Sequence, residues 1–230
     1  MVSGRAVELI GDVGSCHMGD RNRALRLAWC GLEAGLDAVK FQLLTDAQLR
    51  GGNIGLDWDF LPTIRDQIDG LACRVFASAF DHAGVRFLAQ HGFRDIKFAY
   101  SQWALFTELV KGSELAGFDR IYVSSDPMRP DARAMRLPRR DLRLLYCIPE
   151  YPVRYRVDFE GLFGGIRPRF DGFSSHCLGI EQDLEAVRAG ARILEVHFTL
   201  DDPMIDCPDH GFALRPAQLK ELVERVRALP

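Results

Sequence analysis

The sequence predicts an α/β fold: a single (β/α)8 TIM barrel that spans residues 1–230 as one domain. Eight short apolar runs alternate with segments of helical periodicity from one end of the chain to the other. No repeat or linker interrupts this alternation. An open doubly wound sheet is the competing architecture, but the turn "GDVGSCHMGD" after the first run lacks the G-x-G-x-x-G spacing of that fold.

The eight apolar runs are the predicted strands. They are more continuous than alternating, as strands of a parallel sheet are when both of their faces are buried. They cover residues 7–13, 37–44, 73–79, 95–100, 120–125, 143–148, 170–175 and 192–199.

The segments between the runs predict helices. Residues 81–92 begin with the N-cap Asp81 and stop at Gly92, and residues 179–191 stop at a glycine as well. The connection 126–141 is weaker, because its three prolines predict a loop with one turn of helix. Two further helices each show an apolar face, formed by Leu25, Ala28, Trp29, Leu32 and Leu36 in one and by Leu219, Leu222, Val223, Val226 and Leu229 in the other.

Composition and charge restrict the function classes. A net charge of -3 gives no reason to expect nucleic acid or an anionic membrane as partner. No apolar run approaches the roughly 18 residues of a membrane span, and the N-terminus lacks a signal-peptide pattern. The six cysteines have no CxxC spacing and predict reduced thiols of a cytoplasmic protein, with a thiol role left open for Cys16 and Cys207.

The predicted strand ends are unusually polar. The active site of a barrel lies at the C-terminal ends of its strands. Lys40 and Lys97 stand out, because a lysine in a buried strand needs an anionic partner. Each could pair with a neighbouring Asp or Glu. The alternative is that both lysines converge on a bound phosphate or carboxylate, together with the hydroxyls of three strand-end serines, Ser78, Ser124 and Ser174.

Two histidines stand at the ends of the last two predicted strands, His176 in "GFSSH" and His197 in "LEVHFT". A single histidine of this kind is usually a core residue held by a hydrogen bond. Two on adjacent strands can approach within metal-binding distance, and imidazole suits a divalent Mn, Fe, Co or Zn ion. Asp12 and Asp209 are available to bind or orient a water beside such an ion.

The motifs together resemble the sialic acid synthase (N-acetylneuraminate synthase, NeuB) family over nearly the whole chain. They are "GDVGSCHMGD", "DAVKFQ", "VFASAFD", "IKFAYS", "LLYCIPEYP", "GFSSHCLGIE", "LEVHFTLD" and "PDHGFALRPAQL". The resemblance implies a (β/α)8 barrel that condenses phosphoenolpyruvate with an N-acetylated amino-sugar aldehyde. It also implies a divalent metal, typically Mn²⁺ or Mg²⁺. We expect the barrel domain only, without the family's C-terminal antifreeze-like (SAF) domain, and the resemblance leaves a homodimer open.

The resemblance also implies roles for individual residues. His176 and His197 match the metal ligands, and Lys40, Lys97, Ser124 and Ser174 match positions that hold phosphoenolpyruvate. Ser78 takes the place of a threonine in the same cage, and Gln42 is added to it as a substrate-binding residue. The expected catalytic residues are Tyr151 beside the sugar, Asp209 near the metal and Asp12 in place of a glutamate. The chain departs from the family pattern at Cys16, Met18, Tyr100, Gln102 and Pro149.

The predicted function is a metal-dependent condensation of phosphoenolpyruvate with an aldehyde acceptor, an N-acetylmannosamine-like or divergent sugar. The products are a 2-keto-3-deoxy acid and phosphate. Two alternatives remain at the level of sequence. One is an aldolase that forms a Schiff base on Lys40 or Lys97. The other is a barrel that has lost catalysis and serves as a binding or assembly subunit, which the departures at Cys16, Gln102 and Pro149 suggest.

Overall fold

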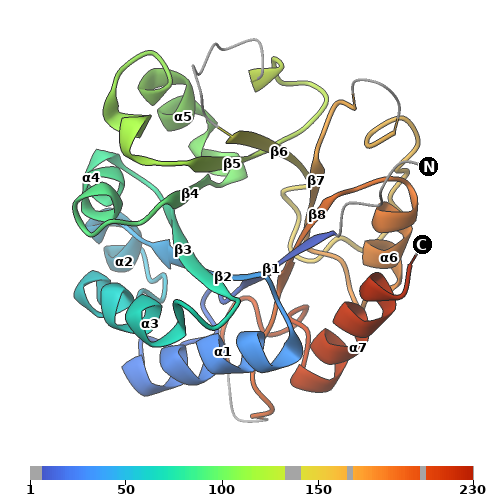
Figure 1. The fold of residues 1–230 in the computed structure, drawn as a ribbon, viewed down its shortest axis with the longest axis horizontal. Coiled ribbons are helices and arrows are strands. Elements are labelled where there is room, and N and C mark those ends of the chain that lie inside the picture. The colour runs from blue at the N-terminus through green and yellow to red at the C-terminus, as the bar shows by residue number, and fades with distance from the viewer. Residues whose placement is uncertain (1–6, 133–140, 165–167, 203–205, 230) are drawn as a thin grey trace.

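The computed structural model describes residues 7–132, 141–164, 168–202 and 206–229. Its eight strands are parallel, each pairs with the next, and β8 closes the ring against β1 (Figure 1). This confirms the predicted barrel. The strands are β1 (Glu8–Asp12), β2 (Ala38–Leu43), β3 (Arg74–Ala79), β4 (Asp95–Phe98), β5 (Arg120–Ser125), β6 (Asp141–Cys147), β7 (Gly172–Ser175) and β8 (Ile193–His197).

Helices form a ring around the outside of the barrel (Figure 1). Those of α type are α1 (Arg21–Ala34), α2 (Asp46–Arg50), α3 (Leu61–Ile68), α4 (His82–Gln90), α5 (Trp103–Leu109), α6 (Glu181–Arg188) and α7 (Pro216–Arg227). Short 3-10 turns are η1 (Trp58–Phe60), η2 (Tyr100–Gln102) and η3 (Glu114–Gly117). Within the described residues no helix combines the length and the apolar character that crossing a membrane requires.

The expectation of a helix between strands is wrong for the connection after β6, whereas the connection after β5 was predicted to be a loop with one turn of helix. In the described parts of the connections after β5 and β6 the chain forms no α-helix. Prolines explain this, because Pro127, Pro130, Pro149 and Pro152 remove backbone donors and restrict the residue before them. Most of the arginine-rich stretch of the connection 126–141 lies at residues 133–140, outside the described residues.

The expected helix caps are present, and one predicted helix face is right only in part. Asp81 accepts a hydrogen bond from the Gly84 amide at 2.8 Å, which begins α4 as predicted. In α1 the buried face includes Ala24, Leu27 and Ala28, whereas Trp29 is exposed. The buried face includes an arginine and a glycine, so a search for large apolar residues at helical spacing found Ala28 but centred the face too far toward Trp29.

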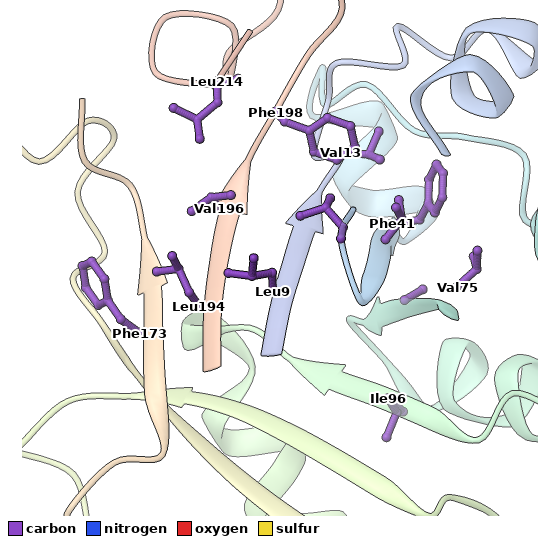
Figure 2. Packing of buried hydrophobic residues seen from close by; sticks show 14 of the residues in the cluster. Leu9, Val13, Phe41, Val75, Ile96, Phe173, Leu194, Val196, Phe198 and Leu214 are labelled. Atoms are coloured by element: carbon purple, nitrogen blue, oxygen red, sulfur yellow. The ribbon is translucent and has the colours of Figure 1, made fainter. Parts of the chain in front are cut away.

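Outward-facing strand residues form the main hydrophobic core between the barrel and the helices. Figure 2 shows Leu9, Leu194 and Phe173 on the neighbouring strands β1, β8 and β7. The approach of α1 to the barrel is close, because a Cβ atom on Gly31 would lie 2.5 Å from Cγ2 of Val39. Burial of this face explains why the strand runs are apolar throughout.

Inward-facing residues form three layers along the barrel axis. The middle layer is apolar and consists of Ile10, Ala38, Phe76, Tyr122, Leu145 and Ile193. At its centre the rings of Phe76 and Tyr122 stack with centroids 5.2 Å apart. This layer separates two groups of charged residues, one at each end of the strands.

The charged group at the N-terminal ends of the strands is called here the lower cluster: Glu8, Arg74, Asp95, Arg120 and the hydroxyl of Tyr122. Arg74 forms salt bridges with Glu8 and Asp95. Arg120 lies 3.3 Å from Glu8, which also accepts a hydrogen bond from the Tyr122 hydroxyl at 2.6 Å. Each carboxylate is therefore ion-paired with arginine, and the cluster closes this end of the barrel.

Candidate active site at the C-terminal end of the barrel

The upper cluster, defined as Asp12, Lys40, Lys97 and Glu195, lies at the C-terminal ends of the strands. The sheet register explains why these residues meet. Asp12 lies beside Lys40 on β2, and Glu195 lies beside Ser174 on β7. Side chains alternate between the two faces of a strand, so all four point into the barrel.

Lys40 is held by two carboxylates and a hydroxyl. Its Nζ atom lies 2.6 Å from Oδ2 of Asp12, 3.2 Å from Oγ of Ser78 and 3.7 Å from Oε1 of Glu195. The side chains of Lys40 and Asp12 are each only 3% exposed. Lys40 therefore shows the simpler of the two alternatives left open by the sequence, a pair with a neighbouring acidic residue, while binding of an anion by both lysines stays a prediction.

Glu195 completes the upper cluster, and the sequence-based prediction missed it. Nζ of Lys97 lies 2.8 Å from both of its carboxylate oxygens, and Ser174 donates a hydrogen bond to Oε1 at 2.8 Å. Strand alternation could have identified this residue. Glu195 precedes His197 by two positions in β8 and so faces the same interior.

Electrostatics keeps the carboxylates of this cluster ionised. Burial alone would raise the pKa of Asp12, but the Lys40 ammonium and the His197 imidazole hold that pKa well below its ordinary value. Burial would also raise the pKa of Glu195, but Lys40 and Lys97 outweigh this effect and lower that pKa below its ordinary value. Two carboxylates thus balance two lysines, and the upper cluster has no formal net charge.

The lysines respond differently to the same surroundings. Burial opposes the charge on Lys40, but Asp12 and Glu195 raise its pKa above the ordinary value. Burial, with Lys40 nearby, lowers the pKa of Lys97 despite its contact with Glu195. Lys40 is therefore the more firmly charged of the two.

The histidine pair stands beside the upper cluster. The ring centroids of His176 and His197 are 5.4 Å apart. Nδ1 of His176 lies 2.9 Å from the carbonyl oxygen of Ile148. Because a carbonyl can only accept, this nitrogen carries the hydrogen, and Nε2 of His176 keeps a free lone pair. Burial lowers the pKa of His176 to about 4, so the ring is neutral near pH 7.

The second histidine has a buried nitrogen with no hydrogen-bond partner, Nδ1 of His197. This atom lies 3.9 Å from Oδ1 of Asp209, and Nε2 lies 3.4 Å from Oδ2 of Asp12. In the part of the chain that the structure describes, no group of three or more His, Cys, Asp or Glu side chains is arranged to hold a metal. The chemistry of these two imidazoles fits a metal bound by two protein ligands, with other positions left for water or substrate.

Asp209 is fixed by the loop after β1. Its Oδ2 atom accepts hydrogen bonds from the backbone amide and the hydroxyl of Ser15, both at 2.6 Å. Gly14, at φ +52°, passes so close that an added Cβ would lie 2.4 Å from this oxygen and 2.8 Å from Nδ1 of His197. The two loops are therefore packed against each other beside the histidines.

One cavity of about 220 Å³ collects nearly all of the predicted site residues. Tyr151 lies at its rim, exposed, with its ring centroid 4.1 Å from that of His176. Ser78 is not in the lining and lies behind Lys40. The other ten predicted residues line the cavity: Asp12, Lys40, Gln42, Lys97, Ser124, Tyr151, Ser174, His176, His197 and Asp209.

Comparison with known proteins places this geometry in context. A model of the NeuB family matches residues 51–230. N-acetylneuraminate-9-phosphate synthase of Drosophila melanogaster is 28% identical over 260 residues, which cover 98% of this chain and 69% of that protein. N,N'-diacetyllegionaminic acid synthase of Legionella pneumophila is 24% identical over 95% of this chain and 71% of its own length.

Solved structures agree on the fold. The N-acetylneuraminic acid synthetase of Leptospira borgpetersenii superposes with a TM-score of 0.81 at 23% identity, over 96% of this chain and 84% of that chain. The spore coat polysaccharide biosynthesis protein SpsE of Bacillus subtilis gives the same TM-score and identity, over 99% of this chain and 70% of that one.

Proposed function

Because the chain belongs to the NeuB family, whose named relatives include acid synthases, we propose that it condenses phosphoenolpyruvate with an aldehyde acceptor. The products would be a 2-keto-3-deoxy acid and phosphate. The observation that supports this most is the convergence of Lys40 and Lys97 on one cavity that is also lined by two histidines. A barrel with only a structural role has no need for buried lysines at an open end.

The lysines and serines would bind the donor. The phosphate and carboxylate of phosphoenolpyruvate require cationic and hydroxyl donors, which Lys40, Lys97, Ser124 and Ser174 present to the cavity. Glu195 holds Lys97 in place through both of its oxygens. We therefore assign Asp12 and Glu195 the task of orienting the lysines and keeping them protonated.

His176 and His197 would hold a divalent ion, Mn²⁺ or Mg²⁺ by the family resemblance. Such an ion would supply two positive charges, which the balanced upper cluster lacks, and a Lewis acid for the acceptor carbonyl. The hydrogen bond from His176 to Ile148 fixes the tautomer that leaves Nε2 free. Tyr151, whose ring contacts that of His176, would border the acceptor sugar.

The chemistry forms one carbon–carbon bond and breaks one carbon–oxygen bond. The C3 carbon of phosphoenolpyruvate attacks the aldehyde carbon, and the former carbonyl oxygen takes a proton. Water then adds at C2 and loses a proton, and collapse of the adduct releases phosphate. Asp209 is better placed than Asp12 to accept that proton, because Asp12 is bound by Lys40 and its low pKa makes it a weak base.

Phosphoenolpyruvate with ¹⁸O in the bridging position tests this reaction. The Mn²⁺-loaded protein is mixed with a panel of aldehydes that includes N-acetylmannosamine, its 6-phosphate and 2,4-diacetamido sugars, and phosphate release is followed. We expect one aldehyde to release phosphate that contains the label. Label retained in the ketoacid would contradict carbon–oxygen cleavage, and the absence of release with every aldehyde would contradict the condensation.

The Schiff-base aldolase remains a second candidate because burial lowers the pKa of Lys97. Its contact with both oxygens of Glu195 opposes this reading, since a nucleophilic amine must be deprotonated. Borohydride in the presence of pyruvate separates the two functions. Covalent trapping at Lys97 would favour the aldolase, and the condensation predicts none.

The remaining expectations concern the setting of the enzyme. The partners we propose are small molecules alone, with a homodimer left open and neither nucleic acid nor a membrane expected at a net charge of -3. Free cysteines fit a reducing cytoplasm.

A further inference from the structure

Two cysteines from distant parts of the sequence meet beside the candidate active site. Cys16 follows Ser15 in the loop after β1, and Cys207 precedes Asp209 by two residues in the loop after β8. Their Sγ atoms are 3.4 Å apart, and both residues are buried, at 0% and 6% exposure. A disulfide requires about 2.05 Å between sulfur atoms, so these two need to approach by roughly 1.4 Å.

The two thiols differ in reactivity. Hydrogen bonding to Cys16 lowers the pKa of Cys207, so Cys207 forms the thiolate more readily than its neighbour. The same hydrogen bond, together with burial, raises the pKa of Cys16. A thiolate in contact with a protonated thiol is the arrangement in which an oxidised sulfur is captured by its neighbour.

We propose that Cys16 and Cys207 form a reversible disulfide when the protein meets a peroxide, and that this cross-link slows the condensation by displacing Asp209. The Cys207 thiolate attacks one peroxide oxygen, the O–O bond breaks, and the departing hydroxide leaves as water. Cys16 then loses its proton and attacks the sulfenic sulfur of Cys207, which forms the S–S bond and releases a second water. The two thiols together lose two electrons, and these electrons reduce one peroxide to two waters.

The packing of the two loops explains how the disulfide would move Asp209 in the candidate active site. Asp209 is already at hydrogen-bonding contact with Ser15, so the loops cannot simply slide closer along that line. Gly14 leaves no spare room, since a single added Cβ would collide with both Asp209 and His197. The approach of the two sulfur atoms must therefore shift Asp209 relative to His197.

Peptide mapping tests the cross-link without reference to activity. Wild-type protein is treated with a few equivalents of hydrogen peroxide, blocked with iodoacetamide and digested with trypsin without reductant. We expect titratable thiols to fall from six to four, with tryptic peptides 6–21 and 193–220 linked to each other. Dithiothreitol should restore all six. The variant Cys207→Ala should form no link, whereas the control Cys73→Ala, altered at the other end of the barrel, should form it.

Persistence of all six thiols, or a link between other cysteines, would overturn the disulfide. The effect on turnover rests on the proposed function and is measured separately, as the rate of phosphate release before and after oxidation. We expect about a tenfold or greater loss that dithiothreitol reverses and that Cys16→Ala does not show. An unchanged rate in fully linked protein would overturn the displacement of Asp209. A reduced protein without activity on any aldehyde would contradict the proposed function instead, and the peptide map alone would then decide the disulfide.

Discussion

Each end of the barrel contains a cluster of two cationic and two acidic side chains, but the two clusters differ in the type of cation and in exposure to solvent. In the lower cluster Arg74 and Arg120 bind Glu8 and Asp95, and the two arginine side chains are 37% and 31% exposed. In the upper cluster the cations are lysines, with side chains that are only 3% and 1% exposed. An apolar layer around Phe76 separates the two groups.

The choice of cation explains the difference. The planar guanidinium of arginine donates to several carboxylates at once, as Arg74 and Arg120 do with Glu8 and Asp95 in the lower cluster. A lysine is a compact charge that shifts its pKa readily and can share its donors with a second anion. The lower cluster therefore closes the barrel, and the upper cluster is the one that we propose binds the donor.

The largest expected effect comes from a neutral replacement at the upper end. The double variant Lys97→Met/Glu195→Gln removes the cation and its counter-ion together, which preserves charge balance and folding. We expect kcat/KM for phosphate release to fall by about 10³-fold, because Lys97 would stabilise the anionic donor. The matched variant Arg74→Met/Glu8→Gln at the lower end should keep wild-type kinetics. Equal losses in the two variants would contradict the assigned roles.

Single substitutions compare the clusters by stability. Glu195→Gln leaves Lys97 buried without its counter-ion, and we expect the free energy of unfolding to fall by about 3 kcal/mol. Glu8→Gln should cost only about 1 kcal/mol, because its partners are partly exposed to water. Urea denaturation of both variants at pH 7 measures this difference. A smaller loss of stability for Glu195→Gln than for Glu8→Gln would contradict the expectation.

Acid sensitivity is expected at the upper end through His17. Burial lowers the pKa of His17 to about 4, below the ordinary value of 6.5. The folded state then binds fewer protons than the unfolded state between these two values, so stability falls as the pH drops from about 6.5 toward 4. The stability that His17 contributes near neutral pH should decrease by about 2 kcal/mol at pH 4.5.

The variant His17→Asn isolates this contribution. In the wild type, Nδ1 of His17 accepts a hydrogen bond from the Gly19 amide. The side-chain oxygen of asparagine can accept the same hydrogen bond, and asparagine does not titrate. Denaturation midpoints between pH 7 and 4.5 should fall less in this variant than in the wild type. Parallel pH profiles for the two proteins would show that His17 is not the group responsible.

The smallest expected effect is at the lower end. Tyr122→Phe keeps the ring stacked on Phe76 and removes only the hydrogen bond to Glu8. We expect a loss of about 1 kcal/mol in stability and no change in the rate of phosphate release. A loss of activity in this variant would mean that the apolar layer transmits changes from one end of the barrel to the other.

Sequence patterns predicted the barrel well because each strand is buried on both faces and forms an uninterrupted apolar run. The same patterns selected residues that meet in one cavity. Polar side chains are rare in apolar strand runs, so those at the strand ends stand out in the sequence. Glu195 was missed because its position was treated as part of an apolar strand. Its partnership with Lys97 joins positions 98 residues apart, which no local pattern encodes.

The contact between Cys16 and Cys207 is a second feature that local patterns do not encode. It depends on two loops that follow the first and last strands, and these become neighbours only when β8 closes the barrel against β1. The buried face of α1 was predicted only in part for a related reason. The face against the barrel is chosen by close approach at Gly31, and small residues give no apolar signal in the sequence.

The central claim, that the upper cluster binds phosphoenolpyruvate, is tested most directly by calorimetry. Phosphoenolpyruvate is titrated into Mn²⁺-loaded wild type, Lys97→Met/Glu195→Gln and Arg74→Met/Glu8→Gln, without any acceptor. The account predicts binding to the wild type and the lower-cluster variant, and none to the upper-cluster variant. Absence of binding to the wild type, or equal binding to all three proteins, would contradict it.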